Sequence, residues 1–74
     1  MMQVMEQERI WAFRTLKSLA VNPLSLSKKR LIMLLRASGI PFPEKDRFIS
    51  YLEGQPDEFI TLFLEDLQEG DHLG

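Results

Sequence analysis

The apolar positions of this chain recur with the period of an α-helix and divide it into four segments. The spacing predicts helices over about residues 2–20, 26–38, 43–53 and 56–69. No stretch alternates apolar and polar residues over the length of a strand, and β-branched residues are few. Short connections pack successive helices against each other. The pattern therefore predicts an all-α fold, a compact bundle of four helices with a central helical hairpin.

The first segment has one apolar stripe and a second, smaller apolar face. At 100° per residue, the stripe that is expected to face the core consists of Met2, Met5, Ala12, Phe13, Leu16, Leu19 and Ala20. Val4 and Trp11 project from a different face, seven positions apart. Asn22-Pro23 is expected to end this helix, because a residue before proline disfavours the helical conformation.

The second segment contains an unbroken apolar run from Leu31 to Leu35. A helix that is apolar on nearly all sides is usually surrounded by other helices, and we expect that here. Either Ser25 or Ser27 can cap its start through the side-chain oxygen. Gly39 stands where a residue in the left-handed conformation commonly ends a helix.

Proline and glycine mark the bounds of the last two segments. Pro43 suits the first turn of the third helix, which Gly54 is expected to end. Pro56 suits the start of the fourth, and Gly70 is expected to end it, leaving residues 71–74 as a frayed tail. The expected apolar faces are Phe48, Ile49, Tyr51 and Leu52 in the third helix, and Phe59, Ile60, Phe63, Leu64 and Leu67 in the fourth.

Length and composition change this picture little. A chain of 74 residues is long enough for one domain, spanning 1–74, and not for two. The absence of cysteine excludes disulfides, thiolate metal sites and thiol catalysis. No apolar run approaches the 18 or so residues that a membrane span needs, and the N-terminal residues lack the features of a signal peptide. We therefore expect a cytoplasmic protein without a membrane partner.

Catalytic and metal-binding chemistry finds little support in the residue types. The single histidine, His72, is the third residue from the end of the tail, whereas a catalytic triad needs partners locked within hydrogen-bond reach. Glu69 and His72 have the i, i+3 spacing of di-iron bundles, but those bundles carry a second such motif on a facing helix. The glycines are isolated and form no phosphate-binding loop. We expect no enzymatic activity, cofactor or metal.

Charge is divided unequally along the chain. Residues 28–47 contain six cations and two acids, a net charge of +4, whereas residues 53–74 contain seven acids and no lysine or arginine, a net charge of −7. The cations of the basic segment are Lys28, Lys29, Arg30, Arg36, Lys45 and Arg47. Such a chain is suited to self-association or to docking on a partner with matching patches.

Three of these cations crowd the expected first turn of the second helix, where the helix dipole disfavours positive charge. Two explanations are open. A phosphate could bind there, since a helix N-terminus already attracts anions. Alternatively, carboxylates of Glu65, Asp66 or Glu69 could balance the cations, within one chain or across a dimer.

The stretch R-L-I-M-L-L-R-A-S-G-I-P-F-P-E-K-D-R-F-I-S-Y-L resembles the helix–turn–helix of SAP domains, small modules that bind DNA through basic helix starts. Leu31, Leu35, Gly39 and Ile40 match the family's first helix and glycine turn. The chain departs from the family in lacking the second glycine of the turn and in carrying Lys28 at a usually apolar position. The resemblance covers about a third of the chain and implies nucleic-acid binding.

The sequence favours a non-catalytic protein–protein interaction module, a small bacterial regulator or adaptor that binds a partner protein or itself. The expected apolar contact surface is Val4, Met5 and Trp11, although Trp11 can equally close one end of a monomeric core. The six cations of the basic segment form the expected charged surface. The alternative is weak, salt-dependent nucleic-acid binding through the basic start of the second helix.

Overall fold

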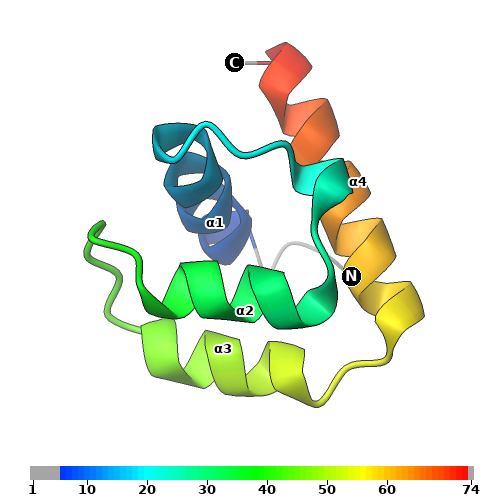
Figure 1. Ribbon diagram of the computed structural model, residues 1–74. Coiled ribbons are helices and arrows are strands. Elements are labelled where there is room, and N and C mark those ends of the chain that lie inside the picture. The colour runs from blue at the N-terminus through cyan, green and yellow to red at the C-terminus, as the bar shows by residue number, and fades with distance from the viewer. Residues whose placement is uncertain (1–5, 74) are drawn as a thin grey trace.

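A computed structural model of the chain describes residues 6–73, with the side chains of residues 6–69. In this part the chain forms four α-helices and no strand, which confirms the predicted all-α bundle. The elements are α1 (Glu6–Ser18), the 3₁₀ helix η2 (Pro23–Ser25), α2 (Lys28–Arg36), α3 (Lys45–Glu53) and α4 (Asp57–Leu73). Figure 1 shows α2 and α3 side by side in opposite directions as the central hairpin, with α1 on the other side of α2. The helix α4 crosses the end of the hairpin where α2 begins and α3 ends.

One apolar core joins all four helices. Its buried members are Trp11, Ala12, Leu16, Leu31, Leu35, Phe48, Ile49, Leu52, Ile60, Phe63, Leu64 and Leu67. At its centre, the ring of Phe48 meets Trp11 on one side and Phe63 on the other, both edge-to-face, with centroids 6.2 and 5.8 Å apart. Such aromatic pairs add to the free energy gained from burying apolar area. The predicted face of the fourth helix is confirmed, with Phe59 half-buried at its edge.

The helix α1 ends at Ser18 in a backbone motif that the sequence does not predict. The N–H of Val21 donates to the carbonyl of Leu16 at 3.0 Å, and the N–H of Ala20 donates to that of Lys17 at 3.0 Å. These two bonds define a Schellman motif, which requires a left-handed residue at Ala20, and its φ is indeed +57°. Leu19 lies beyond the last turn with 49% of its side chain exposed, so its predicted place in the core is wrong.

A short 3₁₀ turn, η2, leads into α2. The Asn22 side chain caps it by accepting the N–H of Leu24 at 3.0 Å. Because residues 23–25 form this turn, α2 starts at Lys28 rather than near residue 26. Of the two predicted caps, Ser27 is the one that is confirmed, since its hydroxyl accepts the N–H of Arg30 at 3.2 Å.

The hairpin α2–α3 differs from its prediction at the connection. The helix α2 ends at Arg36, and no glycine of the described part has a positive φ, so Gly39 does not end the helix as predicted. Pro43 lies before α3 rather than in its first turn, in a β-turn closed by the N–H of Lys45 donating to the carbonyl of Phe42 at 3.1 Å. Proline at the second position of such a turn has the φ that the turn requires.

The bounds of α3 and α4 are closer to expectation. Gly54 follows the last residue of α3, as predicted, and its N–H donates to carbonyls of the last turn. The carbonyl of Pro56 accepts the N–H groups of Phe59 and Ile60 at the start of α4. Gly70 does not end α4 as predicted, because the helix continues to Leu73. A glycine inside a helix costs only about 1 kcal/mol, which a helix docked along the core can absorb.

Candidate interaction surface

Of the predicted apolar contact residues, Trp11 lies in the core and Val4 and Met5 lie outside the described residues. The Trp11 side chain is only 3% exposed. Its indole N–H donates to the carbonyl of Ile40 at 2.9 Å, and its ring stacks on that of Phe42 with centroids 5.2 Å apart. Trp11 therefore closes one end of the core, the alternative that the sequence left open, and is not available to a partner.

Two of the six predicted cations hold the fold together. The Lys28 ammonium donates to the carbonyl of Gln55 at 2.5 Å, which ties the start of α2 to the connection between α3 and α4. The Lys45 ammonium donates to the carbonyl of Ser38 at 3.4 Å, across the hairpin connection. Both lysines are half-buried, so neither is a freely accessible contact for a phosphate.

Two more cations form ion pairs at the surface. Arg36 pairs with Glu53 across the hairpin, with Nη2 and Oε2 2.6 Å apart. Arg47 pairs with Glu44 three positions earlier at 3.5 Å. Exposed pairs of this kind contribute little stability, so they leave the arginines able to exchange partners.

Lys29 and Arg30 remain exposed at the start of α2. Among the side chains of residues 6–69, no carboxylate lies within ion-pair distance of either cation. The acids expected to balance them are elsewhere: Asp66 pairs with Arg9 at 3.6 Å, and Glu65 and Glu69 face solvent. Within the described side chains, Lys29 and Arg30 therefore form no ion pair, and Asp57 is the acid that lines a groove together with Lys28 and Lys29.

The outward face of α2 combines these cations with an exposed apolar side chain. Leu31 and Leu35 are the buried residues of the helix, and Met33, on the opposite face, is 55% exposed. Lys29 and Arg36 lie four positions before and three positions after Met33, on the same stripe. The prediction that other helices surround α2 is thus wrong, because the apolar run extends onto an uncovered face. We call Lys29, Arg30, Met33 and Arg36 the basic α2 face.

A groove of about 490 Å³ adjoins this face between the start of α2 and α4. Its lining consists of Leu26, Ser27, Lys28, Lys29, Ile32, Asp57, Ile60, Thr61 and Leu64. The aliphatic side chains supply an apolar lining, and the charged residues of the lining are Lys28 and Lys29 at the start of α2 and Asp57 at the start of α4. Because Lys29 belongs to both, the groove and the basic α2 face form one continuous surface.

The outward face of α4 has the opposite charge and the same pattern. Glu58, Leu62, Glu65 and Glu69 follow each other at i, i+4, i+7 and i+11, on the side opposite the buried residues of this helix. All four are exposed, and Leu62 is 62% exposed, the highest value among the large apolar side chains of the described part. We call these four residues the acidic α4 face.

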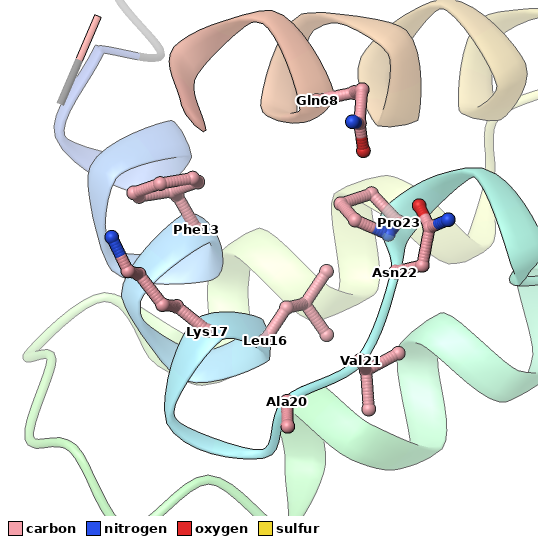
Figure 2. Close-up of a pocket in the computed structure, with 8 residues that line it drawn as sticks. All are labelled: Phe13, Leu16, Lys17, Ala20, Val21, Asn22, Pro23 and Gln68. Carbon is pink, nitrogen blue, oxygen red and sulfur yellow. The ribbon is translucent and has the colours of Figure 1, made fainter. Parts of the chain in front are cut away.

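Two smaller hollows are less suited to a charged partner. Figure 2 shows the one of about 260 Å³ between the end of α1, η2 and α4, where Phe13, Leu16, Pro23 and Gln68 surround the space. The other, of about 240 Å³, lies beside the Trp11–Phe42 stack. Within the described part, no group of three or more histidine or carboxylate side chains is placed to hold a metal ion.

Comparison of the chain with protein-family models, with curated proteins and with solved structures gives no match. The resemblance to SAP domains therefore stays a prediction from the sequence. None of the helices within residues 6–73 has the length and apolarity needed to cross a bilayer. The surface itself is the basis for a functional conclusion.

Proposed function

We propose that this protein is a non-catalytic protein–protein interaction module, a small cytoplasmic, bacterial regulator or adaptor, which binds its partner through the basic α2 face and the adjoining groove. The observation that carries the proposal is Met33, a long apolar side chain left exposed between Lys29, Arg30 and Arg36. A flexible methionine adapts to irregular apolar surfaces and is common where proteins bind several partners. Cations around it select a partner that carries acids.

The partner that fits is an amphipathic helix with an apolar row flanked by carboxylates. Its apolar side chains would cover Met33 and enter the groove beside Ile32, while its acids would meet Lys29 and Arg30. Acids at that place would also offset the unfavourable charge at the first turn of α2. Nucleic acid suits the same surface less well, because Lys28 and Lys45 are engaged with backbone carbonyls and a phosphate backbone offers no apolar group to Met33.

The test is a titration of the ¹⁵N-labelled protein with a synthetic helical peptide that carries one row of leucines flanked by glutamates. We expect amide shifts along α2 and the groove, and their loss in the double variant Lys29→Glu, Arg30→Glu. The control variant Arg14→Glu, Arg47→Glu makes the same change in net charge at exposed positions outside the surface, and it should bind normally.

A short DNA duplex is titrated in parallel. Binding of the duplex through Lys29 and Arg30, without any response to the peptide, would replace the proposal by the nucleic-acid alternative. Peptide-induced shifts at residues remote from α2 would reject the assigned surface.

A further inference from the structure

The basic α2 face and the acidic α4 face have complementary patterns on one molecule. Each presents an exposed apolar side chain between two charges, basic–apolar–basic at Lys29, Met33 and Arg36, and acidic–apolar–acidic at Glu58, Leu62 and Glu65. Both follow the spacing i, i+4, i+7, which places the outer residues of each stripe about 10 Å apart along the helix axis. The two stripes therefore match in length and in the position of the apolar residue, and they are opposite in charge.

We infer that the occupant of the basic α2 face is a second copy of this chain, bound through its acidic α4 face. This inference rests on the proposed function and names the partner. In the contact, Met33 of one copy packs against Leu62 of the other, and the cations meet the glutamates on either side. Arg36 keeps its bond to Glu53 and still has donors for a second carboxylate, since a guanidinium carries five N–H groups.

An antiparallel arrangement of the two helices is the favoured one. It sets Lys29 against Glu65 and Arg36 against Glu58, and it brings Glu69 toward the first turn of α2. Glutamates at that end stabilise the helix start that Lys29 and Arg30 disfavour, through the helix dipole. Lys29 and Arg30, which form no ion pair among the described side chains, then meet carboxylates in the assembly.

The contact joins two different surfaces, so each bound pair leaves one basic α2 face and one acidic α4 face free. Such a heterologous contact grows into larger assemblies unless the rotation between copies closes a ring. A single pair of helix faces buries less than the roughly 1,200 Å² that separates weak from stable interfaces. The association is therefore weak, reversible and sensitive to salt, because its charges lie at the surface.

The test is sedimentation equilibrium of the full chain up to about 1 mM, where even a contact with a Kd of about 1 mM occupies a measurable share of the faces. We expect the average mass to rise with concentration and the rise to weaken at high salt. Two variants interrupt the contact from opposite sides, one with Lys29→Glu and Arg30→Glu, the other with Glu58→Lys and Glu65→Lys. In the first variant like charges meet at the start of α2 and only the attraction between Arg36 and Glu58 remains. In the second variant like charges meet at both ends of the stripe. In each variant alone, the association constant should fall about tenfold or more.

Mixing the two variants provides the decisive measurement. The first keeps an intact acidic α4 face and the second an intact basic α2 face, so the mixture should associate where each alone does not. Labelling one variant at a time with ¹⁵N should show amide shifts confined to α2 and α4. Two control variants change exposed positions outside both faces and should associate as the unaltered protein does. One is the double variant Arg14→Glu, Arg47→Glu, and the other is the double variant Glu44→Lys, Asp46→Lys.

Two results would overturn the inference: a monomer at every concentration and salt, or association that survives in both single-face variants. Circular dichroism of each variant shows that the loss of association is not a loss of folding. The peptide titration separates this inference from the proposed function. A chain that binds the acidic peptide through α2 and yet stays monomeric retains the proposed function and loses the second copy as partner.

Discussion

Replacing Ala20 by glycine should stabilise this protein, although it removes a methyl group and increases the freedom of the unfolded chain. Ala20 occupies the left-handed position of the Schellman motif that ends α1, with φ at +57°. For a residue with a Cβ atom, that conformation costs roughly 1–2 kcal/mol. Glycine removes this cost but adds about 0.4–1 kcal/mol of unfolded-state entropy. The difference is a net gain of about 0.5–1 kcal/mol.

Ala37 offers a matched control. It is also an exposed alanine within two residues of a helix end, but its φ is −89°, a conformation that alanine adopts without strain. Ala37→Gly therefore carries the entropic cost alone and should destabilise the protein by about 0.4–1 kcal/mol. The two substitutions have the same chemistry and opposite expected signs, which separates backbone strain from any general effect of glycine.

The assay is urea unfolding of the two variants and the unaltered chain, followed by the fluorescence of the single, buried Trp11 and by circular dichroism. With an unchanged m-value, Ala20→Gly should shift the midpoint upward and raise Tm by about 2–8 °C. A midpoint at or below that of the unaltered chain, or the same shift for both variants, would refute the strain assigned to Ala20.

Three further outcomes follow from the core and from the surface ion pairs. Phe63→Ala, at a fully buried site, should lower the free energy of unfolding by about 3–5 kcal/mol. That is much of the roughly 4–11 kcal/mol expected for a chain of this length, so circular dichroism should show a partly unfolded protein at 25 °C. Trp11→Phe keeps an aromatic ring in the core but leaves the Ile40 carbonyl without its donor, and should cost about 1–3 kcal/mol in urea unfolding followed by circular dichroism. Arg36→Gln should lower the free energy of unfolding by at most about 1 kcal/mol, and the two proteins should be equally stable at 1 M salt. A larger loss of stability, or one that salt does not change, would mean that the pair with Glu53 is more than a surface contact.

Local signals in the sequence were sufficient for the four helices and for several of their ends. The stripe of α4 and the Ser27 cap follow from spacing and from side-chain chemistry that act within a few residues, so they needed no knowledge of the fold. The end of α1, in contrast, could not be predicted without knowledge of the fold. An alanine in the left-handed conformation is disfavoured locally, and the packing of Val21 against the core accompanies it. The same holds for Trp11, because its neighbours Ile40 and Phe42 belong to a connection that no helical period describes.

Only part of the interaction surface could be predicted from the sequence. The cations at the start of α2 stood out, but the run from Leu31 to Leu35 gave no indication of which of its five apolar residues would remain uncovered. Packing against α1 and α3 decides that Met33 does. The acidic α4 face is predictable from the sequence, because the stripe that predicts the buried side of α4 also places Leu62 on the opposite side, between Glu58 and Glu65.

Hydrogen bonds at both backbone groups of Ile40 link the connection between α2 and α3 to α1. Its carbonyl accepts the Trp11 indole, its own N–H donates to the Ser38 hydroxyl at 3.1 Å, and that hydroxyl lies 2.8 Å from the one of the buried Thr15. Backbone opening at Ile40 therefore requires the movement of α1 as well. In native-state hydrogen exchange, the Ile40 amide should behave as a member of the same cooperative unit as α1, protected to the same free energy, although it lies in a loop.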